Sequence, residues 1–256
     1  MIKLYNGDCL DVMTTLPDKS IDFICCDLPY GITDFDWDIA IPMDKLWEQY
    51  ERVITDTGSI ALFASGKFLP VVLSCNPTLY KYLWVWEKNT PTMFVHARNR
   101  PMTKCEFICM FSKGTPNHDG IAKQRMLYNP QGVSVAKTPK VHKSRMCEIG
   151  RFLHGHHMDQ EYTQEYEGYP SDVLHFKNCT KILHPTEKPV PLLEYLIKTY
   201  TNEGMTVMDN CMGSGSCGEA CVHTGRNFIG IEKDKGFFEI AENRLQNLKW
   251  QGGLLE

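Results

Sequence analysis

The stretch "VMDNCMGSGSCGEA", residues 207–220, decides the fold that the sequence predicts. An apolar run ends in Asp209, and Gly213 and Gly215 then form a turn into a segment with the composition of a helix. A second apolar run, "NFIGIE", follows this segment and ends in Glu232. A strand, a glycine turn, a helix and a second strand that ends in an acid are typical of one half of a doubly wound α/β sheet.

The glycine turn also indicates a nucleoside site. Gly213 and Gly215 let backbone amides come close to a ligand because no Cβ stands in the way, and Glu232 could accept hydrogen bonds from ribose hydroxyls. The turn lacks the third glycine of the dinucleotide fingerprint and the Gly-Lys-Ser/Thr of a phosphate loop, which disfavours NAD and ATP. On these residues alone, a tight turn without any ligand explains the glycines equally well.

The rest of the chain alternates between strand patterns and helix patterns. We predict strands at residues 2–5, 21–26, 59–64, 81–88, 104–113, 205–209 and 227–232, and helices at 43–54, 190–200, 214–225 and 234–248. The predicted fold is therefore α/β, with a doubly wound and mostly parallel sheet in a single domain over residues 1–256. One long break, at about residues 114–180, has no periodicity and is predicted to be a functional insertion.

Composition and cysteine use indicate the cellular compartment. No apolar stretch approaches the ~20 residues that a membrane-spanning helix needs, and the N-terminus has no signal pattern. The 11 cysteines are odd in number and scattered, so we expect free thiols in a soluble, cytoplasmic protein with no membrane contact. A cluster of Cys147, His154, His156 and His157 matches no common zinc spacing, so no metal is expected.

Basic residues are concentrated in one segment. Residues 81–151 contain 13 Lys and Arg against 4 Asp and Glu, a net charge of +9, which leaves 14 against 27 elsewhere, a net of −13. This segment also contains four aromatic residues that could stack on bases, namely Trp84, Trp86, Phe94 and Tyr128. The pattern favours contact with a nucleic acid over an idle soluble surface.

A second stretch, "CCDLPYGIT" at residues 25–33, places a carboxylate, a proline and an aromatic ring directly after a predicted buried strand. Together with "MGSG" it resembles the amino-group DNA methyltransferases that use S-adenosylmethionine, in the permuted subgroup whose catalytic motif precedes the cofactor motif. The resemblance extends to "GDCLDVM", "HPTEKP" and "FIGIEKD", at residues 7–13, 184–189 and 228–234. It covers both ends of the chain closely, and the middle only in placement.

The resemblance implies a role for each residue of the catalytic motif. The Asp27 carboxylate and the Leu28 carbonyl would accept the two hydrogens of the target amine and aim its lone pair at the methyl group. Tyr30 would stack on the base and Pro29 would fix the turn. The target base would have to leave a double-stranded DNA helix to reach this pocket, which costs a few kcal/mol.

The resemblance also implies contacts to the cofactor, S-adenosylmethionine. Asp8 would bind its adenine, and the methionine end would be contacted by His184, Thr186 and Lys188. Asp209, Gly213, Gly215 and Glu232 complete the predicted cofactor set. Without the resemblance, Asp8 would be a helix cap and the "HPTEKP" residues a helix entry.

Three residues depart from the family pattern, and several alternatives stay open. Leu28 replaces the first proline of the usual Asp-Pro-Pro-Tyr motif, while Asn210 and Cys211 replace Pro-Phe in the cofactor loop. The acidic start of the catalytic motif resembles adenine-N6 enzymes, with cytosine-N4 enzymes as the nearest alternative. A protein-glutamine methyltransferase and a catalytically inactive DNA-binding module are further alternatives. The sequence leaves open the recognition site and whether the protein is a homodimer.

Overall fold

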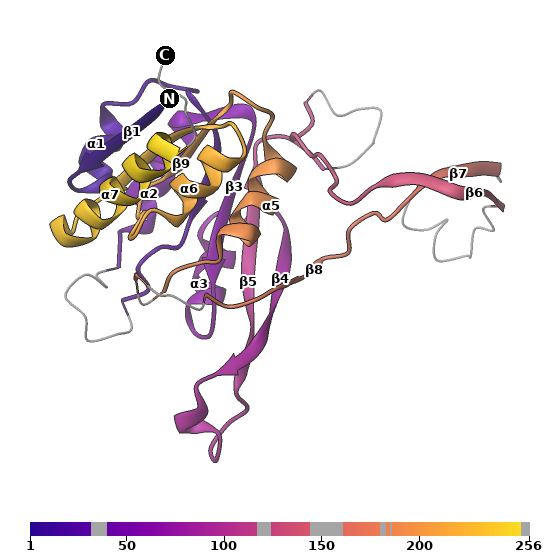
Figure 1. Cartoon of the computed structure of the whole chain (residues 1–256), viewed down its shortest axis with the longest axis horizontal. Helices are drawn as coiled ribbons and strands as arrows, with labels where there is room; N and C mark the ends of the chain where they lie inside the picture. Colours follow the sequence, from indigo (N-terminus) through magenta and orange to yellow (C-terminus); the bar gives the residue numbers. More distant parts are fainter. Residues whose placement is uncertain (32–39, 117–123, 144–160, 180–182, 185, 252–256) are drawn as a thin grey trace. The chain divides into compact units, whose positions relative to one another are not determined.

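The computed structural model describes residues 1–31, 40–116, 124–143, 161–179, 183–184 and 186–251. They divide into two compact units, residues 1–129 with 172–256, and residues 130–171. The first unit is built on an eight-stranded sheet (Figure 1). Its strands, in spatial order, are β1 (Ile2–Asn6), β10 (Asn227–Glu232), β9 (Thr206–Asp209), β2 (Ile21–Cys26), β3 (Ile54–Ala64), β5 (Thr103–Ser112), β4 (Tyr80–Thr92) and β8 (Val173–Phe176).

The sheet is mixed but mostly parallel. The pairs from β1 through β10, β9 and β2 to β3 are all parallel, as is the pair β4 and β8. Only β5 runs antiparallel to its neighbours, β3 and β4. The mostly parallel α/β sheet predicted from the sequence is therefore confirmed.

Among the described residues, three helices cover each face of the sheet, which makes the sheet doubly wound. One core cluster joins the first face to α1 (Cys9–Thr14), α2 (Met43–Val53) and α3 (Phe68–Cys75). The other cluster joins the second face to α5 (Val190–Tyr200), α6 (Ser216–His223) and α7 (Lys235–Gln251). The spacing of α2 shows why it packs, because Leu46, Trp47, Tyr50 and Val53 recur at helical intervals and are all buried.

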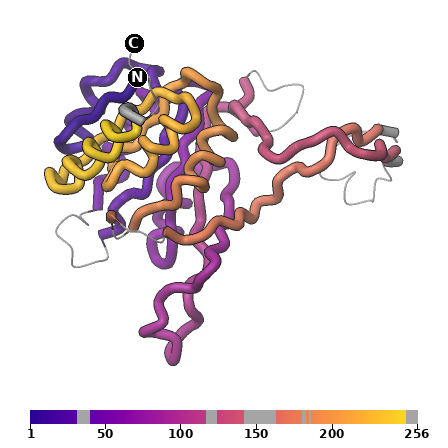
Figure 2. Tube along the Cα trace, viewed as in Figure 1, coloured from indigo at the N-terminus to yellow at the C-terminus, as the bar shows by residue number. Residues whose placement is uncertain are grey.

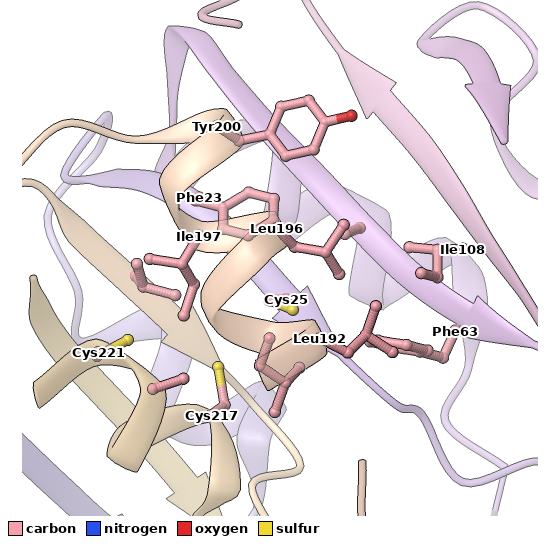
Figure 3. Packing of buried hydrophobic residues seen from close by; sticks show 14 of the residues in the cluster. Phe23, Cys25, Phe63, Ile108, Leu192, Leu196, Ile197, Tyr200, Cys217 and Cys221 are labelled. Atoms are coloured by element: carbon pink, nitrogen blue, oxygen red, sulfur yellow. The ribbon is translucent and has the colours of Figure 1, made fainter. Parts of the chain in front are cut away.

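The core under α5 also fixes two tryptophans of the basic segment. Phe23 of β2 stacks on Tyr200 at the end of α5, with ring centroids 5.4 Å apart (Figure 3). Trp84 Nε1 donates to Tyr200 Oη at 2.6 Å, and Trp86 Nε1 donates to the Phe176 carbonyl at 2.9 Å. Both tryptophan side chains are 3% exposed. The prediction that Trp84 and Trp86 stack on bases is wrong, because their rings are part of the hydrophobic core.

The second unit is a two-stranded antiparallel ribbon of β6 (Ser134–Lys143) and β7 (Glu161–Glu167). Gly132 and Gly168 meet at its base, both with φ of +83°, and a Cβ on Gly168 would lie 2.5 Å from the Gly132 carbonyl oxygen. The predicted insertion at 114–180 thus contains strands that its sequence did not reveal. One of them, β8, belongs to the main sheet.

The predictions about metal binding and free cysteines involve some residues that lie outside the described ranges. Cys147, His154, His156 and His157 lie outside the described residues. Within the described ones, no group of three His, Cys, Asp or Glu side chains is placed to hold a metal ion. Every cysteine in the described ranges is a free thiol, and no described helix is both long enough and apolar enough to cross a membrane.

Candidate functional site

A cavity of about 1560 Å³ opens at the carboxyl ends of the parallel strands in the first unit. The chain runs outward from β9 through α6 to β10 and in the opposite direction from β2 through α2 to β3, so β9 and β2 flank the point where the winding reverses. Ligands of open α/β sheets bind at such a switch point. The cavity walls include the residues that follow β1, β2, β9 and β10.

The predicted catalytic motif lies directly after β2. Asp27 lines the cavity, and Tyr30 Oη donates to Asp27 Oδ1 at 3.1 Å. The Tyr30 ring stacks on Phe68 of α3, with centroids 4.3 Å apart and planes 20° from parallel. The Leu28 side chain is buried at 3% exposure in the core under α1 and α2, and both Leu28 and Pro29 line the cavity.

Four charged side chains of alternating sign form what we call the ion chain: Lys88, Glu106, Lys188 and Asp27. Lys188 Nζ donates to Asp27 Oδ2 and lies 3.6 Å from Glu106 Oε2, and Lys88 Nζ donates to Glu106 Oε1 at 2.5 Å. No member has a side chain more than 17% exposed, and all four line the cavity. Glu106 Oε2 is fully buried and has no partner within hydrogen-bonding distance.

Two opposing effects set the pKa values in the ion chain. Burial disfavours the charged forms, and attraction between neighbouring opposite charges favours them. Burial acts to lower the pKa of Lys188, but the carboxylates of Asp27 and Glu106 outweigh this effect and raise the pKa. Burial likewise opposes ionisation of Glu106, but the ammonium groups of Lys188 and Lys88 lower its pKa overall. Burial raises the pKa of Asp27, with Lys188 opposing this effect. Lys188 is therefore a fixed cation between two carboxylates.

The sequence did not single out Glu106 or Lys88, and it assigned Lys188 to the cofactor. The available signal was a glutamate inside the apolar run "CEFICMF", because a charged residue buried in a strand needs a partner. Glu106 pairs in register with Trp86 of β4, which places Lys88 nearby. Lys188 comes from a loop 161 residues after Asp27, so no local pattern could connect them.

A second group of cavity-lining residues, which we call the amide end, consists of Asp209, Gly213 and Glu232. Glu232 Oε2 accepts from the Gly213 backbone N–H at 2.9 Å, and its Oε1 accepts from the Asp234 N–H at 2.8 Å. Asp209 Oδ1 accepts from the Cys211 N–H at 3.1 Å. Burial raises the pKa of Asp209 to about 7, with that backbone hydrogen bond opposing the effect. Carboxylates here are held by backbone amides rather than by lysines.

Glycine is required at residues 213 and 215 of the turn for different structural reasons. Gly213 lines the cavity with φ of +50°, and a Cβ there would lie 3.3 Å from the His184 ring. Gly215 caps α6 with φ of +80°, and a Cβ there would lie 2.9 Å from the Cβ of Ala241 in α7. Among the described residues that line the cavity, Gly215 does not appear. Packing of α6 on α7 is enough to require glycine at 215.

The remaining predicted residues, Asp8, His184 and Thr186, also line the cavity. Asp8 accepts from the Leu10 N–H at 3.0 Å as the N-cap of α1, and its Oδ2 pairs with Lys233 at 3.0 Å. The His184 ring packs edge-on against Phe237 with centroids 4.2 Å apart, and the Thr186 N–H donates to His184 Nδ1 at 3.3 Å. Burial, together with the nearby Lys188 charge, lowers the pKa of His184 to about 4, so its imidazole is neutral at pH 7.

Asn210 and Leu28, which depart from the family pattern, each make stabilising contacts nearby. Tyr50 Oη donates to Asn210 Oδ1 at 2.6 Å, and both side chains are buried. This hydrogen bond anchors the loop after β9 to α2, at a position where the usual proline would stiffen the loop covalently. Leu28 likewise gains apolar burial in place of proline stiffness.

A family model described as DNA methylase, N6_N4_Mtase, matches residues 21–243. The DNA adenine methyltransferase YhdJ of Escherichia coli (strain K12) is 27% identical over 259 residues, covering 94% of this chain and 82% of the relative. Type II methyltransferase M.HpaI of Haemophilus parainfluenzae is 26% identical over 259 residues, covering 96% and 74%.

Solved structures share the fold. The M1.HpyAVI-SAM complex superposes with a TM-score of 0.63 at 24% identity, covering 96% of this chain and 100% of that one. The cytosine-N4-specific PvuII DNA methyltransferase gives a TM-score of 0.63 at 13% identity, covering 98% and 92%. With the family model matching most of the sequence, the chain belongs to the N6/N4 amino-group DNA methyltransferase family.

Proposed function

We propose that the protein is a DNA adenine-N6 methyltransferase that acts on an adenine flipped out of double-stranded DNA, in the cytoplasm. The observation that carries the proposal is the setting of Asp27. Its carboxylate lines the cavity at the switch point of the sheet, and Tyr30 and Lys188 hold it from two sides. An acid at the start of the motif supports adenine rather than cytosine as the target, by resemblance to the adenine enzymes.

S-adenosylmethionine is the cofactor, and it supplies a methyl group activated by its sulfonium charge. The chemistry of the amide end fits it. Asp8, Asp209 and Glu232 provide acceptors for ribose hydroxyls and amino groups, and their negative charge disfavours a phosphate chain. The cavity volume of about 1560 Å³ exceeds the ~300–1,000 Å³ of a typical ligand pocket, leaving room for a base beside the cofactor.

Asp27 and Leu28 position the amine. Each Asp27 oxygen keeps a second lone pair beyond its bond to Tyr30 or Lys188, and one of these accepts an amine hydrogen. The Leu28 carbonyl accepts the other hydrogen, which directs the nitrogen lone pair at the methyl group. Phe68 covers one face of the Tyr30 ring, and the base stacks on the other.

Asp27 also receives the proton that the amine releases after transfer. A nitrogen that has gained a methyl group is strongly acidic, so a carboxylate suffices as the acceptor. Burial raises the pKa of Asp27, which makes it a better proton acceptor than an exposed carboxylate. The Lys188 ammonium keeps Asp27 ionised beforehand by charge attraction.

The test is to identify the methylated nucleoside. The purified protein is incubated with S-adenosylmethionine carrying a deuterated methyl group and with DNA from a host lacking methyltransferases, and the digested nucleosides are analysed by mass spectrometry. We expect labelled N6-methyldeoxyadenosine. Labelled N4-methyldeoxycytidine would instead assign the cytosine reaction. If neither product forms and calorimetry detects no cofactor binding, the protein is a DNA-binding module without activity.

The predicted insertion at about residues 114–180 is proposed to recognise the DNA target, and residues 130–171 form its core. The first part of this core, residues 130–151, belongs to the basic segment 81–151. If they contact phosphates, log affinity for DNA falls with log salt at about −0.9 per neutralised phosphate. Replacing Lys137, Lys140 and Lys143 with glutamine should flatten that slope by about 2 and weaken cognate and non-cognate duplexes equally. Filter binding at several salt concentrations measures both. An unchanged slope would remove these lysines from the interface.

A further inference from the structure

The hairpin between β4 and β5 carries an exposed apolar tip that the proposed chemistry does not use. The two strands continue past the end of the sheet, and a register shift between Glu87 and Thr92 marks where the extension begins (Figure 2). Every residue from 93 to 102 is exposed. Phe94 and Val95 are 79% and 82% exposed, which are high values for large apolar side chains in a unit with two well-packed cores.

The tip is internally hydrogen-bonded. Residues Phe94–His96 form a short 3-10 helix, η1, and the N–H groups of His96 and Arg100 donate to the carbonyls of Met93 and His96, both at 3.0 Å. Met93 has φ of +68°, a left-handed conformation that is costly for a residue with a long side chain. The turn therefore presents Phe94 and Val95 to solvent in a fixed geometry rather than as a flexible loop.

Charge on the hairpin suits a polyanion. Between Lys88 and Lys104 the sequence contains Arg98 and Arg100 and no Asp or Glu. Both arginines lie in the exposed tip. An apolar wedge flanked by arginines is the combination with which proteins insert into a DNA helix while holding its phosphates.

The position of the tip beside the cavity favours DNA rather than a protein as the partner that contacts it. Thr92 and Thr103 at the root of the tip, and Met93 and Arg100 within it, line the same cavity as Asp27. A base that enters the cavity leaves a gap in the duplex, and that gap lies beside the mouth. A protein partner seated on the tip would instead stand where the substrate must enter.

We propose that Phe94 and Val95 insert into the duplex beside the flipped base and stabilise the gap by stacking and apolar contact, while Arg98 and Arg100 contact the adjoining phosphates. The inference rests on the proposed function, because it assumes a base that leaves the helix. It adds an interaction surface on the hairpin between β4 and β5, formed by residues of the first unit rather than by residues 130–171.

The experiment compares two substrates that differ in the cost of flipping. One duplex has a normally paired target base, and in the other the target lies opposite an abasic site, so that little pairing must be broken. We expect Phe94→Ala to weaken binding to the paired duplex about tenfold, equivalent to about 1.4 kcal/mol. Binding to the abasic duplex should change less than about twofold, since the gap there needs no support from the protein.

Val95 and Val71 provide a matched pair. Val71 of α3 is also an exposed valine, at 46%, but it does not line the cavity and is not on the hairpin. Val95→Ala should reproduce part of the Phe94→Ala effect, whereas Val71→Ala should bind both duplexes like the wild type. All three side chains are exposed, so circular dichroism and melting temperatures should be unchanged, which excludes misfolding as the cause.

Three results would overturn the proposal. Equal binding of the paired duplex by Phe94→Ala and the wild type would show that the tip does not insert. An equal loss on both duplexes would show a general contact with no link to the gap. Loss of a dimer in sedimentation, with DNA binding intact, would assign the tip to a second copy of the chain. Because the assay measures binding, it stands even if the wild type transfers no methyl group, which would defeat only the proposed function.

Discussion

The ion chain and the amide end, which both line the cavity, hold their carboxylates by different means. In the ion chain, Asp27 and Glu106 are balanced by buried lysines that come from distant parts of the sequence. At the amide end, Asp209 and Glu232 accept hydrogen bonds from backbone N–H groups within the turns that carry them or close by. A side-chain network fails when one member is replaced, because a charge is left unpaired, whereas a backbone N–H remains after any substitution at its own residue except proline. We therefore expect the ion chain to be the more fragile end.

The largest expected effect is on catalysis at the ion chain. Asp27→Ala should lower turnover by about 10²–10³-fold or more, equivalent to about 2.7–4 kcal/mol, because an acceptor aimed at the reacting amine is lost. Cofactor affinity, measured by calorimetry, should stay within a few fold, since Asp27 does not belong to the amide end. Turnover near that of the wild type would remove Asp27 from its proposed catalytic role.

The second prediction compares a buried ion pair with an exposed one on adjacent strands. Glu106→Gln leaves Lys88 without its carboxylate and should lower the free energy of unfolding by about 3 kcal/mol. Glu87→Gln removes the exposed pairs with Lys104 and His175 and should lower the free energy of unfolding much less, because solvent screens exposed pairs. Chemical denaturation of both variants provides the measurement. Equal costs would mean that burial of the ion chain has no energetic importance.

The third prediction uses pH to probe the amide end. The pKa of Asp209 is about 7 in the folded protein against a reference of 3.8, so the folded state binds its proton more tightly than the unfolded state. The stability from this group is complete below pH ~4 and is lost as pH rises to about 7. The shift corresponds to about 4 kcal/mol at most, and we expect about 1–2 kcal/mol because water enters the cavity. Asp209→Asn should remove this loss, as denaturation at pH 5 and pH 8 would show. Identical pH dependence in the two proteins would contradict the raised pKa.

The smallest expected effect is on cofactor affinity at the amide end. Gly213→Ala places a Cβ 3.3 Å from the His184 ring and should raise the dissociation constant of S-adenosylmethionine about tenfold, equivalent to about 1.4 kcal/mol. Gly204→Ala is the matched control, because Gly204 also has positive φ, +80°, but its Cβ would meet nothing within 4 Å. Calorimetry on both separates backbone strain from crowding of the site. Equal affinities would place the cofactor elsewhere.

The sequence predicted those elements whose apolar period is unambiguous. The central strands and the amphipathic helix α2 follow directly from alternation and helical spacing. Helix α3 was missed because "FLPVVLSC" is apolar on all sides and contains proline, which hides its period. Strand β8 has four residues, too few to show any period, and it is recognisable only through its pairing with β4.

The sequence predicted the residues of the amide end but not the pairing of the ion chain. The amide end follows one continuous motif, so Asp209, Gly213 and Glu232 could be found together from the sequence. The ion chain joins side chains from three separate regions, and only the folded sheet shows that Glu106 and Lys188 meet. Aromatic composition gave a wrong prediction at Trp84 and Trp86, because a tryptophan ring packs in a hydrophobic core as readily as it stacks on a base.

The strand order has a consequence for folding during synthesis. In the described sheet, β1 pairs only with β10, and β9 lies between β10 and β2. The side chain of Asn6 donates to the Glu232 carbonyl across 226 residues. Contacts this distant in sequence close slowly, and until β9 leaves the ribosome one edge of β2 has no partner. Nascent chains that stop before residue 206 should therefore aggregate or bind chaperones, and the last strands to be made complete the sheet for the first.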